Sequence, residues 1–233
     1  MPPAVGREGH MTPADPDGGA RDGRPVAAFD FDGTITSIDT FRLFLTRIRS
    51  RRALAGTFLR HAPQVALALQ GGPARDAAKA LICLDVLGGL THEDAEAAAT
   101  ATAQVVERSL IRPDARARIR WHLAEGHRII VVSASFDAYV RRVAATLGIE
   151  EVIATKWEVD SRTGVLSGRL DGPNVRGDAK VDLLADHLNG PCDLAYAYGN
   201  SGGDTAMLAH ARHPVRVGRR PMPELDGTPP PGV

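Results

Sequence analysis

The chain has 233 residues, 43% of them hydrophobic, which is enough for one sizeable domain or one domain carrying a large insertion. Its 28 basic and 28 acidic residues cancel, which argues against a nucleic-acid ligand. No apolar run reaches the length of about 18 residues that suggests a membrane span, and Cys83 and Cys192 are too far apart for a zinc motif. We expect a cytoplasmic protein with both thiols in its core and no obligate protein partner.

Both ends of the chain have compositions typical of disorder. Residues 1–24 are rich in Gly, Pro, Asp and Arg and contain no apolar segment like that of a secretion signal. Residues 219–233 include a run of prolines. We predict a disordered leader over 1–24 and a flexible tail over 219–233.

Three short apolar runs between these ends predict buried strands. They span 25–31, 127–132 and 193–198, and none shows the alternation of a half-exposed strand. Helical patterns cover 136–147 and 178–189. This order predicts an α/β fold with a Rossmann-like, doubly wound parallel sheet, whose ligand site lies beyond the carboxyl ends of the strands.

Two segments depart from simple alternation of strands and helices. Residues 151–155 predict a weaker strand, and 156–170 predict a β-hairpin with its turn at 161–164. Residues 39–125 are almost entirely helical in pattern. We predict that 39–125 form a helical cap on an α/β core made of 25–38 and 126–218.

A pair of carboxylates follows the first predicted strand, in the sequence DFDGT. Asp30 and Asp32 stand two residues apart where the buried strand ends, and Gly33 allows the backbone to turn. One carboxylate of such a pair can attack a substrate while the other transfers a proton. The alternative is a solvated turn without chemistry, which is common at strand ends.

Four motifs in order resemble those of the haloacid dehalogenase-like superfamily of phosphotransferases. They are DFDGT, Ser133 at a strand end, Lys180, and the run Gly199-Asn200-Ser201-Gly202-Gly203-Asp204. The resemblance extends from residue 25 to about residue 218. A helical insertion directly after DFDGT is similar to subfamily IB, which includes the phosphoserine phosphatases. It implies an all-helical cap of the C1 type and a Mg²⁺-dependent phosphatase.

The resemblance implies a role for each matching residue. Asp30 would be the nucleophile, would form an aspartyl phosphate and would bind Mg²⁺. Asp32 would protonate the leaving alkoxide and then activate water, with its main-chain carbonyl on the metal. Such an oxygen-only ligand shell suits Mg²⁺.

Two further positions would hold the phosphoryl group. Ser133 would bind a phosphoryl oxygen together with the N–H groups of Ala134 and Ser135 at the start of the next helix. Its alternative role is a helix N-cap. Lys180 would be the cationic anchor, with a solvated helix lysine as the alternative and Lys156 as its rival.

The last motif departs from the family pattern at one position. Asn200 stands where the family normally has Asp. Its amide oxygen can still bind Mg²⁺, but the site loses one negative charge, so we predict weaker Mg²⁺ affinity. Asp204 would remain available to orient a water on the metal.

Phosphoserine phosphatases use an acid and an arginine of the cap to hold the two charged groups of the amino acid. Asp39 falls at the place of the acid, although it could equally be a helix N-cap. No arginine matches: Cys83 falls near its place, and Lys79 lies one turn earlier. We therefore predict Asp39 and Lys79 as substrate-binding residues and leave phosphoserine as one candidate substrate.

The first part of the cap is strongly basic. Residues 40–75 contain seven arginines and no Asp or Glu. A solvated basic face is the ordinary interpretation. Interleaved Phe and Leu residues suggest instead that the cap contacts an anionic membrane or accepts a lipid phosphate.

We predict a phosphatase that acts on a small-metabolite phosphate monoester through an aspartyl phosphate. One alternative is a lipid phosphatase acting on a substrate such as phosphatidylglycerophosphate. The other is a binding module that keeps the fold with weakened catalysis, because Asn200 departs from the motif.

Overall fold

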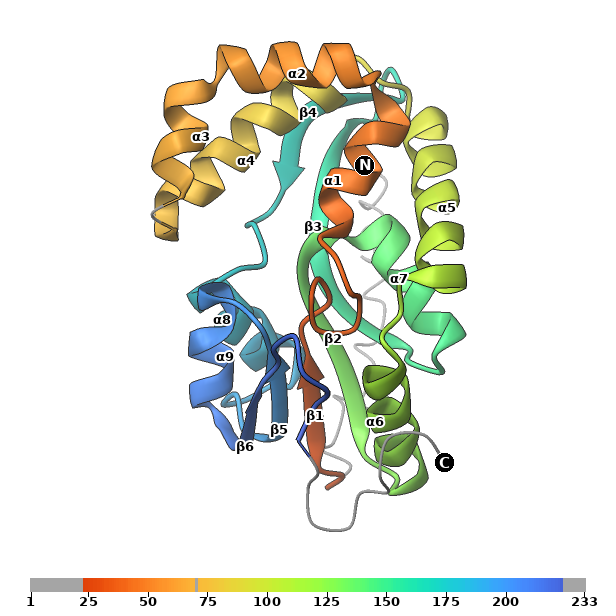
Figure 1. Ribbon diagram of the computed structural model, residues 1–233, viewed down its shortest axis with the longest axis vertical. Helices are drawn as coiled ribbons and strands as arrows, with labels where there is room; N and C mark the ends of the chain where they lie inside the picture. Colours follow the sequence, from red (N-terminus) through yellow and green to blue (C-terminus); the bar gives the residue numbers. More distant parts are fainter. Residues whose placement is uncertain (1–22, 70, 224–233) are drawn as a thin grey trace, which may run out of the picture.

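The computed structural model describes residues 23–69 and 71–223, which form an α/β core with a cap of helices (Figure 1). The core contains a six-stranded sheet of order β4-β3-β2-β1-β5-β6, and only β4 is antiparallel to its neighbour. The strands are β1 Val26–Phe29, β2 Arg128–Phe136, β3 Glu151–Asp160, β4 Val165–Asp171, β5 Leu194–Gly199 and β6 Ala211–Arg216. The predicted doubly wound sheet is confirmed, and the edge strand β6 is an addition to it.

The central strand β1 is apolar throughout because helices cover both faces of the sheet. Ala27 and Phe29 point into one apolar cluster and Ala28 into another. The first cluster includes side chains of α6 and α7, and the second includes side chains of α8 and α9. The core helices are α6 Pro113–Ala124, α7 Asp137–Thr146, α8 Asp178–His187 and α9 Thr205–Ala209, preceded by the short 3₁₀ helix η1 Gly202–Asp204.

The cap lies beyond the carboxyl ends of the parallel strands (Figure 1). Its helices are α1 Thr40–Ile48, α2 Arg51–Arg60, α3 Ala62–Ala68, α4 Gly72–Leu87 and α5 His92–Ser109. The β3–β4 hairpin reaches up from the sheet to the turn between α4 and α5. There Gly89 N–H donates to the Leu166 carbonyl over 3.0 Å, and Leu166 N–H donates to the Leu90 carbonyl over 2.8 Å. The cap therefore rests on an extension of the core.

The predicted end of the cap at residue 125 is too late. Helix α6 lies beside the sheet, and its Ala115 and Ile119 are buried in the same cluster as Phe29. The two chain segments between cap and core pair with each other, since Ser37 N–H donates to the Leu110 carbonyl and Arg112 N–H to the Ile35 carbonyl. A helical pattern identifies α6 as a helix but not the layer on which it packs.

The predicted flexible tail begins too early. Met222 is buried and its N–H donates to Asp114, while the Arg118 guanidinium donates to the Pro223 carbonyl. Residues 219–223 are therefore docked on α6, whereas 1–22 and 224–233 lie outside the described residues. Both cysteines are free and buried, as predicted. Within the described ranges, no helix combines the length and apolarity that crossing a membrane requires.

Candidate active site

The predicted site residues gather on three neighbouring strands, at one edge of the sheet. Asp30 follows β1, Asn200 follows β5, and Ser133 lies in β2, on the other side of β1. Asp30 N–H continues the ladder by donating to the Tyr198 carbonyl over 2.9 Å. The parallel sheet thus brings residues from distant parts of the sequence to one edge.

A buried lysine joins two carboxylates at the centre of the site. Lys180, from α8, is only 1% exposed, and its ammonium lies 2.7 Å from Asp30 Oδ1 and 2.7 Å from Asp204 Oδ1. It also donates to the Val132 carbonyl over 2.7 Å. Lys156, its rival in the sequence, has an exposed side chain in β3. The geometry therefore selects Lys180 as the cation of this site.

The three charges control one another's ionisation. Burial raises the pKa of Asp30, and Lys180 opposes this shift. Burial would lower the pKa of Lys180, but Asp30 and Asp204 together raise it. Burial by itself would raise the pKa of Asp204, but the Lys180 ammonium and several hydrogen bonds outweigh it, so the pKa is lowered. Lys180 is thus held as an ammonium beside the Asp30 carboxyl.

Asp204 holds the loop that follows β5. Its Oδ2 accepts from Asn200 N–H over 3.1 Å, from Ser201 N–H over 2.8 Å and from Ser201 Oγ over 2.9 Å. Gly199 is required below it, because a Cβ there would lie 2.4 Å from Asp204 Cβ. Asp204 therefore fixes both the loop and Lys180, and its role in orienting a water stays a prediction.

Asp32 lies in a different environment from Asp30. Its Oδ1 accepts from Thr40 N–H over 2.8 Å and from Thr40 Oγ1 over 2.6 Å, and its Oδ2 accepts from the Ser135 hydroxyl. The pKa of Asp32 is raised to about 7, mainly by burial and also by the negative charge of Asp39. The hydrogen bonds from Thr40 and Ser135 lower this pKa but do not cancel the increase. A carboxyl with this pKa can both give and take a proton near neutrality.

The segment after Ser133 differs from the prediction. β2 continues to Phe136 with a register shift after Ser133, and α7 begins only at Asp137, so Ala134 and Ser135 do not open a helix. Ser135 N–H donates to Ser133 Oγ over 3.0 Å, while its hydroxyl binds Asp32. The buried Ser133 hydroxyl accepts this bond and keeps its own proton for another acceptor.

Lys79 extends from the cap helix α4 toward the predicted phosphoryl-binding segment. Its ammonium donates to the Ala134 carbonyl and to Asn174 Oδ1, the latter over 2.6 Å. It also lies 5.2 Å from the centre of the Phe41 ring and 5.3 Å from that of Phe136. Burial lowers the pKa of Lys79 to about 8, although nearby acidic groups oppose the shift. The cap therefore places one amine beside the site.

Asp39 is the N-cap of α1. Its carboxylate accepts from Phe41 N–H over 3.0 Å and from Arg42 N–H over 3.4 Å. Its charge still acts on Asp32, whose pKa it raises. The structural alternative for this residue is thus confirmed, and substrate binding by Asp39 stays a prediction.

Asn174 is a site residue that the sequence did not single out. Its Oδ1 accepts from Lys79 and from Thr155 Oγ1, and its Nδ2 donates to Asp76 of α4 over 2.6 Å. It therefore joins the cap to the core. The available signal was the turn Gly172-Pro173-Asn174, which connects the hairpin to the helix of Lys180 and so must pass the site.

The residues present fit a magnesium ion. The Asp30 carboxylate, the Asp32 carbonyl and the Asn200 amide oxygen are the oxygen donors that Mg²⁺ prefers. Gly33, at φ 74°, packs directly against Asn200, because a Cβ on Gly33 would lie 1.9 Å from Asn200 Nδ2. No cluster of three His, Cys, Asp or Glu side chains occurs within 23–69 and 71–223, so a cation here depends on amide and carbonyl oxygens too.

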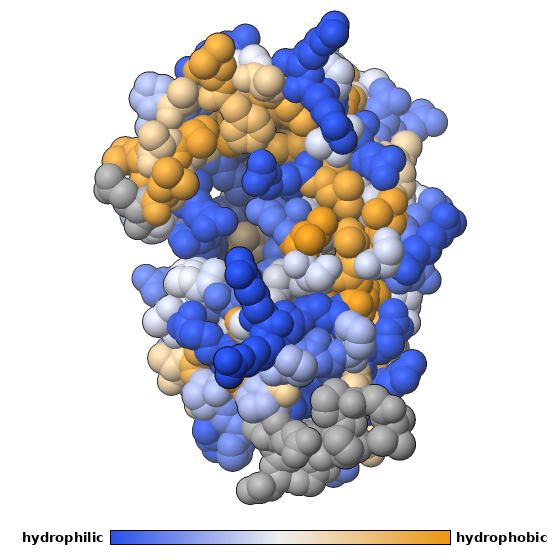
Figure 2. Space-filling model, viewed as in Figure 1, coloured by the Kyte–Doolittle hydropathy of each residue, from blue (hydrophilic) through white to orange (hydrophobic). Residues whose placement is uncertain are grey.

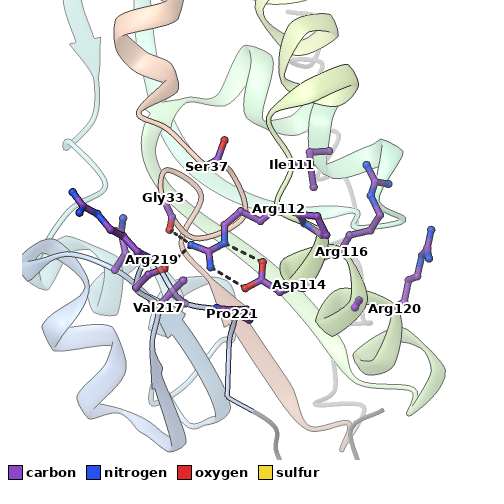
Figure 3. A pocket seen from close by; sticks show the side chains of 14 residues that line it. Gly33, Ser37, Ile111, Arg112, Asp114, Arg116, Arg120, Val217, Arg219 and Pro221 are labelled. Atoms are coloured by element: carbon purple, nitrogen blue, oxygen red, sulfur yellow. Dashed lines mark hydrogen bonds and ion pairs between the residues drawn. The ribbon is translucent and has the colours of Figure 1, made fainter. Parts of the chain in front are cut away.

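A groove of about 1070 Å³ adjoins this loop, on the side of α6 and the C-terminal segment (Figure 3). Arg112 crosses it, pairing with Asp114 and donating to the Gly33 carbonyl over 3.4 Å and the Gly218 carbonyl over 2.8 Å. Burial by itself would raise the pKa of Asp114, but the hydrogen bonds from Arg112 outweigh it, so the pKa is lowered. Arg112 thus ties the DFDGT turn to the base of the cap and to the C-terminal segment.

Comparison with known proteins agrees with this geometry. The family model of the haloacid dehalogenase-like hydrolases matches residues 27–209, which include all the strand-end residues described above. The chain belongs to this family. The predicted superfamily and the likeness to phosphoserine phosphatases are confirmed, and with them the predicted enzyme class, a phosphatase, at the level of family and fold.

Two proteins and one solved structure show how similar this chain is to known proteins. Protein CicA of Caulobacter vibrioides is 38% identical over 186 residues, which cover 80% of this chain and 82% of CicA. A phosphoserine phosphatase of Idiomarina loihiensis is 31% identical over 112 residues, 47% of this chain and 50% of that protein. The structure of a phospho-aspartyl intermediate analogue of phosphoserine phosphatase shares the fold, with a TM-score of 0.56, 22% identity and coverage of 81% and 83%.

Proposed function

We propose that the protein is a cytoplasmic, Mg²⁺-dependent phosphatase that hydrolyses a phosphate monoester through a phosphorylated Asp30. The observation that carries the proposal is the division between two carboxyl groups. Asp30 is held by the Lys180 ammonium at 2.7 Å, whereas burial raises the pKa of Asp32 to about 7. A nucleophile and a proton donor with separate environments are what a two-step phosphoryl transfer needs.

In the first step, an oxygen of Asp30 forms a bond to phosphorus while the bond from phosphorus to the leaving oxygen breaks. Asp32 gives its proton to that oxygen, so the leaving group departs as an alcohol. Lys180 offsets negative charge beside Asp30, and the Ser133 hydroxyl donates to a phosphoryl oxygen. Bound Mg²⁺ would supply further neutralisation of the phosphoryl charge at Asp30, the Asp32 carbonyl and Asn200.

In the second step, the Asp32 carboxylate accepts a proton from water as the water oxygen bonds to phosphorus. The bond between phosphorus and Asp30 breaks, which releases inorganic phosphate and restores both carboxyl groups. Thr40 and Ser135 keep the Asp32 carboxylate oriented between the two steps. Donors to both of its oxygens support the charged form that this step requires.

The substrate we propose is a small metabolite whose leaving group carries an anionic or carbonyl group. Lys79 supports an anionic group, because its half-buried ammonium, which donates to the neutral Ala134 carbonyl and Asn174 amide, would gain a stronger partner from a negative charge. Phosphoserine is one substrate of this kind, and relatives bear the name phosphoserine phosphatase. Because the cap offers Lys79 as its one amine beside the site and Asp39 serves as a helix N-cap, other phosphorylated acids would suit the site equally well.

Turnover of p-nitrophenyl phosphate with and without Mg²⁺ tests the proposal, with Asp30→Asn as the comparison. We expect activity that requires Mg²⁺ and is lost in Asp30→Asn. A rate for the parent equal to that of Asp30→Asn would favour a binding module instead. A screen of amino-acid, sugar, nucleotide and glycerolipid phosphates would then identify the leaving group, and the exposed cap surface makes a lipid phosphate the second candidate.

A further inference from the structure

Helix α3 of the cap is apolar and yet almost uncovered. Its sequence APQVALA contains no charge, and none of its seven residues is buried. Leu67 is 51% exposed, and Leu69, at the helix end, is 88% exposed. Large apolar side chains exposed together on a helix commonly mark a surface that is covered in use.

The outer face of α2 continues this surface. Leu54 and Thr57 are buried on the inner face. The opposite face, half a turn around the helix, carries Arg52, Ala55, Gly56 and Leu59, which are all exposed. Leu59 is 78% exposed and lies two turns from Arg52 on this face. Figure 2 shows apolar surface over α2 and α3, at the top left of the view, with hydrophilic side chains beside it.

The cap segment that carries the exposed leucines is also rich in positive charge. The described part of residues 40–75 carries seven arginines and no Asp or Glu. Arg60 pairs with Asp85 of α4. Among the residues that the structure describes, the other six, which are Arg42, Arg47, Arg49, Arg51, Arg52 and Arg75, form no ion pair with an acid. A partner that fits must therefore be both apolar and negatively charged.

We propose that the α2–α3 surface, formed by Arg51, Arg52, Leu59, Leu67 and Leu69, docks on an anionic lipid bilayer. The leucines would enter the boundary between headgroups and acyl chains, and the arginines would lie against the lipid phosphates. A lipid surface is both apolar and negatively charged over a wide area. This suits leucines that are spread over α2 and α3 and arginines that stand at the start of α2.

Docking would also orient the candidate active site, and this consequence rests on the proposed function. Helix α4 packs against α3 at the cap surface and carries Lys79 on its inner side, toward Ala134. A bilayer under α2 and α3 would therefore lie close to the helix that lines the site. Docking would thus bring the cap side of the site near lipid headgroups, where a lipid phosphate, the second candidate substrate, would be found.

Sedimentation of the full chain with vesicles tests the docking without reference to activity. We expect binding to vesicles of phosphatidylglycerol and phosphatidylcholine, little binding to phosphatidylcholine alone, and weakening by salt. Two variants, Leu59→Ser/Leu69→Ser and Arg51→Gln/Arg52→Gln, should each lower the fraction bound by about tenfold. Matched controls on other faces are Leu123→Ser and Arg162→Gln/Arg212→Gln, which should bind like the parent.

Three results would overturn the docking. They are no binding to anionic vesicles at low salt, equal loss in the control variants, or a dimer of the parent that Leu59→Ser/Leu69→Ser converts to a monomer. Turnover of soluble p-nitrophenyl phosphate separates this test from that of the proposed function. The surface variants should keep the parent rate, because none of their residues lies at the site, and circular dichroism should confirm that they fold.

Discussion

Lys180 and Asp30 stand 150 positions apart in the chain, yet the lysine Nζ donates to Asp30 Oδ1 over 2.7 Å inside the protein. Lys180 lies in the first turn of α8, and Asp30 lies at the end of β1. The same ammonium binds Asp204, so one cation serves two carboxylates. A buried carboxylate without a cation lowers the free energy of unfolding. The contact between Lys180 and Asp30 therefore affects the stability of the fold as well as the chemistry of the site.

Replacing Lys180 by Met should therefore damage both properties. The two carboxyl groups would be left without their buried cation, and we expect the free energy of unfolding to fall by about 3 kcal/mol. Turnover should fall by about a hundredfold or more, because charge on the phosphoryl group loses its partner. Urea unfolding and p-nitrophenyl phosphate hydrolysis measure the two effects. The exposed Lys156→Met is the matched control, and equal activity in both variants would contradict this role.

Asn200→Asp should tighten Mg²⁺ binding. The new carboxylate adds one negative charge beside Gly33, at a position that would share the metal with Asp30, so half-maximal activity should require about tenfold less Mg²⁺. Titration of activity against Mg²⁺ in the parent and the variant measures this change. Asn189→Asp adds the same charge at the end of α8 and should leave the titration unchanged. Equal half-saturation in the parent and Asn200→Asp would show that Asn200 does not bind the metal.

The rate should depend on pH through Asp32. Burial raises the pKa of this carboxyl to about 7, so the acid form that protonates the leaving group is lost as the pH rises through 7. We expect kcat/KM for an alkyl phosphate to fall by about tenfold per pH unit between pH 7.5 and 9. p-Nitrophenyl phosphate needs less proton transfer and should show a flatter profile. Identical profiles for the two substrates would contradict the assignment of Asp32 as the acid.

Lys79 should act on substrate binding alone. Its pKa, lowered by burial to about 8, means that the ammonium is present at pH 7 and lost above pH 8. For a substrate with an anionic leaving group, KM should therefore rise above pH 8 and rise by about tenfold in Lys79→Met at pH 7. Lys79→Arg, which stays charged, should keep a low KM at both pH values. The KM for p-nitrophenyl phosphate should not change, and a loss of kcat there would point to a structural role.

Much of the core could be predicted from the sequence because its strands must be buried on both faces. The apolar run of β1 ends in Asp30, and that of β5 ends just before Asn200, so parallel pairing brings the two together. Spacing within the chain was sufficient for this inference. The order of motifs also predicted Lys180 as the cation of the site, although its burial could not be inferred from a helix that carries Asp178 and Asp182.

Most of the remaining differences depend on packing between distant segments. A helical pattern does not say on which layer a helix packs, so the predicted cap includes α6 although Ala115 and Ile119 of this helix pack in the same cluster as Phe29 of the sheet. The contact of Asn174 with Lys79 depends on how the cap closes over the core. The docking of Met222 likewise depends on Asp114, 108 positions away. Local composition carries no information about such partners.

The most direct test of the account is chemical trapping of the phosphorylated protein. The chain would be mixed with radiolabelled p-nitrophenyl phosphate and Mg²⁺, quenched in acid within one turnover, and digested for mass spectrometry. We predict one phosphorylated peptide, labelled at Asp30 and sensitive to hydroxylamine, that accumulates in Asp32→Asn and is absent from Asp30→Asn. Turnover without any label on Asp30, or label on another residue, would contradict the proposed mechanism.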